Sequence, residues 1–124
     1  MATAVKQAST NQHNKKNALN KCPVTITLDK IGARWKPLIL WHMREGTRRY
    51  NEIRKSLPAI TEKMLIQNLR ELEEDKLVVR IVHPVLPPHV EYKLSATGQS
   101  LMPVLNAMAQ WGVQNGWKPE KTKK

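Results

Sequence analysis

Residues 61–75 follow a helical pattern that separates apolar from hydrogen-bonding side chains. At 3.6 residues per turn, one side gathers Leu65, Asn68, Leu69 and Leu72. The other side carries groups that match base edges: Lys and Arg bond guanine, Gln bonds adenine through two contacts, and Ile touches a thymine methyl. The pattern predicts a helix that reads bases in a DNA major groove. The candidate base-reading residues are Thr61, Lys63, Ile66, Gln67 and Arg70.

The segments on either side of this helix support that interpretation over an ordinary amphipathic helix with a solvated charged face. Asn51 is a natural N-cap for a short helix over Glu52–Leu57, which Pro58 closes. Two strand-like runs follow the longer helix, Leu77–Val82 and Val90–Leu94. Helix, turn, helix and ribbon in this order predict a winged helix-turn-helix fold, mainly α with a small β-ribbon.

Basic residues cluster just before the predicted recognition helix. In helix-turn-helix proteins the first helix crosses the DNA backbone, so these side chains are candidates for phosphate contacts. The alternative is that these basic residues form a solvated charged face with no ligand, which would give the same run of charges. The candidates are Arg48, Arg49, Arg54 and Lys55.

The loop of the ribbon, residues 84–89, contains three prolines and forms the predicted wing. A stiff loop loses little entropy when it lies along a phosphate backbone or in a minor groove. The wing candidates are Arg80, His83, His89 and Lys93, although two histidines in such a loop can also be plain exposed polar residues. With only His83 and His89 nearby and no cysteine, no metal site is expected.

The C-terminal part of the chain predicts a dimer interface. Ser95 is expected to cap a last helix that reaches about Asn115, with Pro103 kinking it or marking a local start. Its apolar face is broader than a domain of this size can cover by itself. The expected interface residues are Leu101, Val104, Leu105, Met108 and Trp111.

Charge and length narrow the class of protein. The chain has 124 residues and a formal net charge of +11, which favours one domain with a polyanionic partner. Residues 1–21 contribute +4 and residues 118–124 contribute +3, which leaves +4 for residues 22–117. The expected organisation is a flexible basic arm over 1–20, a DNA-binding and dimerisation domain over 21–117, and a basic tail over 118–124.

Other features of the sequence argue against a membrane protein and against an enzyme. The longest apolar run, Leu38–Trp41, is too short to span a bilayer, and the first residues do not form a secretory signal, so a cytoplasmic location is expected. No catalytic triad, phosphate-binding loop or carboxylate pair stands out, and no cofactor is expected. The alternative function is a basic winged-helix protein that binds RNA or the ribosome; Tyr92 is the one aromatic residue in the ribbon that could stack on a base.

Several short motifs together resemble the HxlR-type transcriptional regulators, which are related to the MarR winged-helix proteins. The matching residues are Cys22-Pro23-Val24, Trp35-Lys36-Pro37-Leu38-Ile39-Leu40, Lys63-Met64-Leu65, Leu69-Arg70-Glu71-Leu72-Glu73-Glu74-Asp75, Pro87-Pro88 and Val90-Glu91-Tyr92. The resemblance implies a homodimer that is built from the N- and C-terminal helices and binds a pseudo-palindromic operator. The expected mechanism is repression by occupying DNA near a promoter.

Three departures from the family pattern stand out, of which Gly-Ala-Arg at 32–34 in place of a common Gly-Gly-Lys changes little. Lys76 stands where the family usually has glycine, so it must adopt a left-handed conformation at some cost, or the helix must end differently. His89 stands where the family is usually basic, which puts a permanent charge at the tip of the wing in doubt.

Cys22, the single cysteine, is a candidate redox residue. It follows Lys21 and precedes a short helix that Thr25 or Thr27 is expected to cap, and both a cation and a helix N-terminus favour the thiolate. The resemblance implies a sensor of oxidants or electrophiles, acting by an intersubunit disulfide, a mixed disulfide or alkylation. The alternative is a small buried hydrophobe in the dimer core. A small-molecule effector bound near the dimer helices would add to DNA binding.

Overall fold

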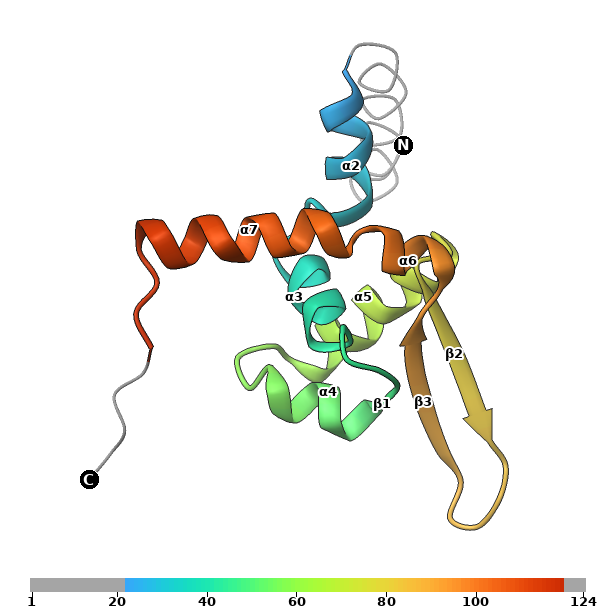
Figure 1. The fold of residues 1–124 in the computed structure, drawn as a ribbon. Helices are drawn as coiled ribbons and strands as arrows, with labels where there is room; N and C mark the ends of the chain where they lie inside the picture. The colour runs from blue at the N-terminus through green and yellow to red at the C-terminus, as the bar shows by residue number, and fades with distance from the viewer. Residues whose placement is uncertain (1–21, 120–124) are drawn as a thin grey trace, which may run out of the picture.

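The structure is a computed structural model that describes residues 22–119. Its elements in chain order are α2 (Pro23–Ile31), α3 (Trp35–His42), β1 (Arg48–Arg49), α4 (Tyr50–Ser56), α5 (Glu62–Glu74), β2 (Val78–His83), β3 (His89–Leu94), α6 (Ala96–Ser100) and α7 (Met102–Asn115) (Figure 1). This order confirms the predicted fold, mainly α with a small β-ribbon. The predicted arm over 1–20 and residues 120–124 of the predicted tail lie outside the described residues.

The sheet has three antiparallel strands in the order β1-β3-β2. The pairing of β2 with β3 runs from Val78 opposite Leu94 to His83 opposite His89, and the ribbon extends well beyond the helices (Figure 1). Since side chains alternate between the two faces of a strand, one face carries the buried Val78, Tyr92 and Leu94. The other face carries their neighbours in sequence and is open to solvent or to a ligand.

Helix α5 begins and ends with well-defined capping interactions. The Thr61 Oγ1 accepts a hydrogen bond from the Met64 backbone N–H at 3.1 Å, as predicted for an N-cap. At the other end, Lys76 has a φ of 62°, in the left-handed region. For a side chain with a Cβ, this conformation costs roughly 1–2 kcal/mol. The first of the two alternatives for Lys76 therefore holds, and the turn directs the chain from α5 straight into β2.

Three predicted helix boundaries need correction. Helix α2 starts at Pro23 with Cys22 as N-cap, earlier than a cap at Thr25 or Thr27, because proline at the first position loses no helical hydrogen bond. Arg49 replaces Asn51 as the N-cap of α4, and its backbone N–H donates to Glu52 Oε1 at 2.7 Å. The predicted last helix is two helices, α6 and α7, which meet at Leu101.

The core lies between α3, α5 and the base of the ribbon. It contains Ile39, Leu40 and Met43 from α3, Ile53 from α4, Leu65, Leu69 and Leu72 from α5, Leu77, Val78, Tyr92 and Leu94 from the sheet region, and Leu105 from α7. Leu105 is therefore buried within its own subunit, and Leu101 packs against the same core. Leu101, the N-cap of α7, stays partly accessible, and the place of both residues in a dimer interface stays a prediction.

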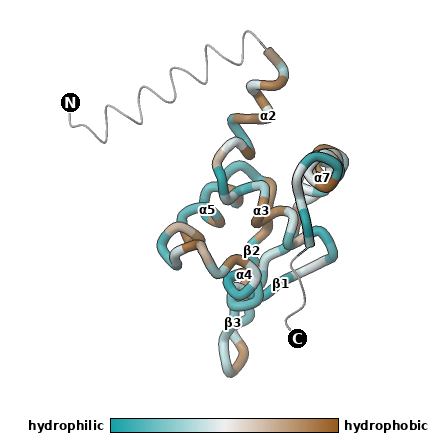
Figure 2. The backbone as a smooth tube through the Cα atoms, turned by 90° about the vertical axis from the view of Figure 1, so that its left-hand side faces the viewer, coloured by the Kyte–Doolittle hydropathy of each residue, from teal (hydrophilic) through white to brown (hydrophobic). Residues whose placement is uncertain are grey.

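Helices α2 and α7 lie on the opposite side of the molecule from the ribbon tip (Figures 1 and 2). Both carry apolar residues that the described part of the chain leaves uncovered. None of the helices within residues 22–119 combines the length and the apolar character that crossing a membrane requires.

Candidate nucleic-acid interface

The exposed face of α5 carries the residues predicted to read bases. Lys63, Ile66, Gln67 and Arg70 are all exposed, while Leu65, Asn68, Leu69 and Leu72 are buried on the opposite face. Asn68 is satisfied inside the helix, where its Nδ2 donates to the Met64 carbonyl at 2.7 Å. The helix is thus anchored by one side and presents basic and amide groups on the other, as insertion into a major groove requires.

Gln67 belongs to a chain of interactions that the sequence analysis did not foresee. Its Nε2 donates to Glu71 Oε2 at 2.7 Å, and Glu71 Oε1 lies 2.7 Å from Lys36 Nζ of α3. Lys36 is buried, so its ammonium depends on this carboxylate. The chain holds the Gln67 amide in place and leaves its Oε1 as the acceptor to offer a base. The i, i+4 spacing of Gln67 and Glu71 was the available signal in the sequence.

A hollow of about 660 Å³ lies between α5 and the ribbon, and we call it the α5–ribbon hollow. Arg49 of β1, Arg70 of α5 and Arg80 of β2 all line it, together with Ile66. Arg80 was predicted as a wing residue. Its position opposite Tyr92 turns it toward the recognition helix instead of the tip. Arginines from three different elements therefore line one hollow beside the recognition helix, where a DNA backbone would pass if the helix were inserted in a groove.

Acidic and phenolic groups complete the walls of the α5–ribbon hollow. Glu62 and Glu73 line it, as does Tyr50. Burial raises the pKa of the Tyr50 hydroxyl, and the neighbouring Glu62 carboxylate raises it further, so the phenol stays neutral. The negative charges of Glu62 and Glu73 repel phosphates, whereas the positive charges of the three arginines attract them. A DNA backbone in the hollow would therefore be favoured on the arginine side.

The predicted backbone contacts fall into separate groups. Arg48 is turned toward α3: its Nε donates to the His42 carbonyl at 3.3 Å, and its guanidinium lies 3.8 Å from Glu45. Burial lowers the pKa of His42, and the charges of Arg44 and Arg48 lower it further. Arg54 and Lys55 lie on the exposed side of α4, where Arg54 makes a long contact of 3.9 Å with Glu62.

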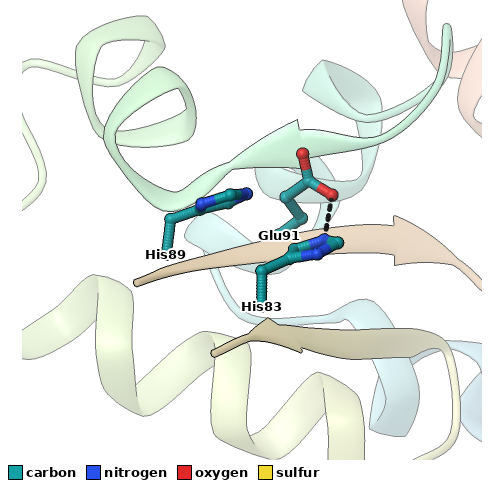
Figure 3. A group of neighbouring side chains, drawn as sticks. All are labelled: His83, His89 and Glu91. Carbon is teal, nitrogen blue, oxygen red and sulfur yellow. Dashed lines mark hydrogen bonds and ion pairs between the residues drawn. The ribbon is translucent and has the colours of Figure 1, made fainter. Parts of the chain in front are cut away.

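The two predicted wing histidines lie against each other at the end of the ribbon. Their ring centroids are 4.5 Å apart with planes inclined by 22°, and His83 Nε2 lies 2.7 Å from Glu91 Oε1 (Figure 3). Lys93 is farther from the tip, opposite Val79. The structure therefore separates Arg80, Lys93 and the histidine pair, which the sequence pattern had grouped together.

Residues 30–120 match the model of the HxlR-like helix-turn-helix family. The chain belongs to this family. It is 47% identical over 94 residues to the HTH-type transcriptional regulator YybR of Bacillus subtilis (strain 168), covering 76% of this chain and 75% of YybR.

Two solved structures show the same fold. The redox regulator HypR in its oxidised form has a TM-score of 0.74 and 45% identity, covering 78% of this chain and all of that chain. The reduced form of the transcriptional regulator YodB from B. subtilis has a TM-score of 0.66 and 34% identity, covering 80% of this chain and 98% of that chain. This HxlR-like protein is accordingly a helix-turn-helix transcriptional regulator with a winged-helix fold.

In this HxlR-like regulator, uncovered apolar side chains are concentrated on the terminal helices. They are Val24, Ile26 and Leu28 of α2, Val104, Met108, Trp111 and Val113 of α7, and Trp117 beyond it. An apolar hollow of about 410 Å³ between α3 and α7 is lined by Leu38, Trp41 and Met108 among others. Cys22 caps the start of α2, where it is half-buried and its side chain makes no capping hydrogen bond.

The Lys36–Glu71 ion pair yields a stability prediction. Glu71→Gln should lower the free energy of unfolding by about 2–4 kcal/mol, because it leaves the buried Lys36 ammonium without its carboxylate. Lys36→Met combined with Glu71→Gln should recover most of that loss, since no charge then remains buried. Urea denaturation at one fixed chain concentration measures the free energy of unfolding of both variants. A double variant as unstable as Glu71→Gln would show that the ion pair is not the cause.

Proposed function

We propose that this regulator binds a pseudo-palindromic DNA operator as a homodimer and represses transcription by occupying it. The observation that carries the proposal is that Arg49, Arg70 and Arg80 all line the hollow beside the exposed face of α5. A helix that enters the major groove needs positive charge along its flank, because the phosphates line both edges of the groove.

Each part of the interface has its own role in this proposal. Lys63, Gln67 and Arg70 read base edges, while Ile66 contacts a thymine methyl and Thr61 fixes the start of the helix. Arg49 and Arg80 hold the phosphates beside the ribbon, and Arg54 and Lys55 hold those beside α4. Arg48, already engaged with α3, contributes positive charge at longer range.

Gln67 and Arg54 form a matched pair for testing these roles. Gln67→Ala should weaken binding to a duplex operator by about 1–3 kcal/mol and leave binding to random duplex DNA nearly unchanged, because a base contact is lost. Arg54→Ala should weaken both alike and reduce the salt slope by about one, because a phosphate contact is lost. Fluorescence anisotropy across a salt series measures both effects. If both variants act equally on specific and random DNA, the assignment of roles is wrong.

The uncovered faces of α2 and α7 support the homodimer. Val24 is 63% exposed and Trp111 is 68% exposed, on helices that lie away from the ribbon (Figure 1). Large apolar groups at this density are typical of a protein interface. A two-fold axis through these helices would place two copies of α5 about one turn of DNA apart, roughly 10 bp between half-site centres.

Adjacent residues on α7 provide a test of the dimer. Trp111→Glu should shift the protein to monomers at micromolar concentration, because it puts a charge into the apolar interface. Gln110→Glu adds the same charge at an exposed polar position of the same helix and should leave the dimer intact. Sedimentation velocity distinguishes the species. A wild-type protein that sediments as a monomer would contradict the proposal.

We also propose that oxidants or electrophiles control this regulator through Cys22. Its relative at 45% identity, HypR, is named a redox regulator, and a solved structure of YodB is of the diamide-treated protein. In this chain the thiol is partly accessible at the start of α2, the helix with the uncovered apolar face. A disulfide between subunits, or a bulky adduct, would change how the two subunits pack and hence the spacing of the recognition helices.

Diamide provides the test of this control. Treatment should change the affinity of wild-type protein for its operator several-fold and should leave Cys22→Ser unaffected, because the chain has one cysteine. Non-reducing electrophoresis and mass spectrometry report whether the product is a dimer or a mixed disulfide. An equal response of wild type and Cys22→Ser would remove Cys22 from the mechanism.

RNA binding is the less favoured function. The aromatic residue of the ribbon that could have stacked on a base, Tyr92, is buried in the core. Single-stranded RNA recognition relies on exposed aromatic side chains on a sheet surface, which the described strands lack. Competition between duplex DNA and RNA of equal length should therefore favour the duplex.

A further inference from the structure

His83, His89 and Glu91 form a compact group on the ribbon (Figure 3). One ligand atom from each residue lies within 4.8 Å of the other two. The sequence offers only the two histidines as neighbours, because Glu91 lies eight positions from His83. The strand register creates the group: His83 is directly opposite His89, and Glu91 is two residues further along β3 on the same face.

Two imidazoles and one carboxylate are ligands that suit borderline divalent ions such as Zn²⁺. Three protein ligands leave a further position of a tetrahedral ion for water or another oxygen. Zinc–ligand bonds of about 2.0–2.1 Å put the ligand atoms of a tetrahedron roughly 3.3 Å apart. His83 Nε2 and Glu91 Oε1 are already 2.7 Å apart, so small side-chain rotations would bring the group to that spacing.

The surroundings fit an ion that can enter and be held in place. All three residues are half-buried, so solvent reaches them while the ribbon limits their movement. The Nδ1 of His89 faces the Pro87 carbonyl at 3.4 Å, the kind of contact that orients a histidine ligand and leaves Nε2 to bind the metal. Six consecutive strand pairs fix the backbone beneath the group.

We propose that His83, His89 and Glu91 bind a divalent transition-metal ion of the zinc class on the wing. The group lies on the ribbon face opposite Arg80, close to the tip, and His89 also lines the α5–ribbon hollow, so the ion would sit beside the surface proposed to face DNA. It would bring two positive charges to a group whose own carboxylate, Glu91, carries one negative charge and stands opposite Arg49 in the strand pairing. One consequence rests on the proposed function: bound zinc should increase the affinity of the protein for its operator.

Isothermal titration of the full chain with ZnCl₂ tests the metal site directly. The Cys22→Ser background removes the thiol as a competing ligand. The protein should bind one Zn²⁺ per chain at this site, and His83→Ala, His89→Ala and Glu91→Gln should each weaken that binding by about tenfold or more. His42→Gln removes a histidine outside the group and should leave the affinity unchanged. Far-UV circular dichroism confirms that each variant is folded.

Nuclear magnetic resonance gives a test that depends on no substitution of the group. Added Zn²⁺ should shift the imidazole resonances of His83 and His89 and leave those of His42 in place. The proposal is overturned if these resonances do not respond, or if the alanine variants bind Zn²⁺ as tightly as their background. His83 and Glu91 would then form a hydrogen-bonded pair and nothing more.

The consequence for DNA is measured separately. Zinc should increase the affinity of the Cys22→Ser protein for its operator several-fold and should have no such effect on the same protein with His89→Ala. If the metal binds and operator affinity does not change, the metal site stands and its link to DNA is refuted. If the protein binds no operator at all, the proposed function fails while the titration still decides the metal site.

Discussion

The burial of one face of α5 against α3 is the constraint on which the rest of the structure depends. Leu65, Leu69 and Leu72 fill the core beside Ile39, Leu40 and Met43, and the Lys36–Glu71 ion pair fixes the rotation of one helix against the other. Each buried aliphatic side chain contributes on the order of 1.5–3 kcal/mol, so any rotation that exposed this face would be costly. The opposite face is thereby left to solvent or to a ligand, and Lys63, Gln67 and Arg70 project from it on one well-anchored helix.

The ribbon extends this arrangement through the alternation of its side chains. One face returns Tyr92 and Leu94 to the core and turns Arg80 toward α5, while the other gathers His83, His89 and Glu91. Residues that are close in sequence therefore have different surroundings. Arg80 and His83 are three residues apart on β2, so their side chains lie on opposite faces of the sheet. The terminal helices α2 and α7 lie on the side of the body away from the ribbon tip, and Cys22 stands at the start of α2 on that side (Figure 1).

The sequence predicted those features that depend on local periodicity and capping. The α5 pattern, the Thr61 cap and the ribbon follow from chain neighbours and are confirmed, and the left-handed Lys76 is one of the two outcomes that the departure from the family pattern left open. The features that the sequence did not predict depend on contacts between residues that are distant in the chain. Lys36 reaches Glu71 because α3 packs on α5. Arg80 lines the same hollow as Arg70 because side chains alternate between the two faces of β2. Glu91 lies beside the two histidines because of the register between β2 and β3. The place of Leu105 in the core was also not foreseen, because an apolar helix face does not reveal whether it covers its own core or a partner.

The central claim is that two copies of α5 read one operator around a two-fold axis. Selection of bound sequences from a pool of random duplex DNA by the purified protein tests it most directly. The account predicts enrichment of an inverted repeat whose half-site centres are about one helical turn apart, roughly 10 bp, and loss of preference at defined positions with Gln67→Ala. Recovery of no common sequence, or of a single unrepeated site, would contradict it.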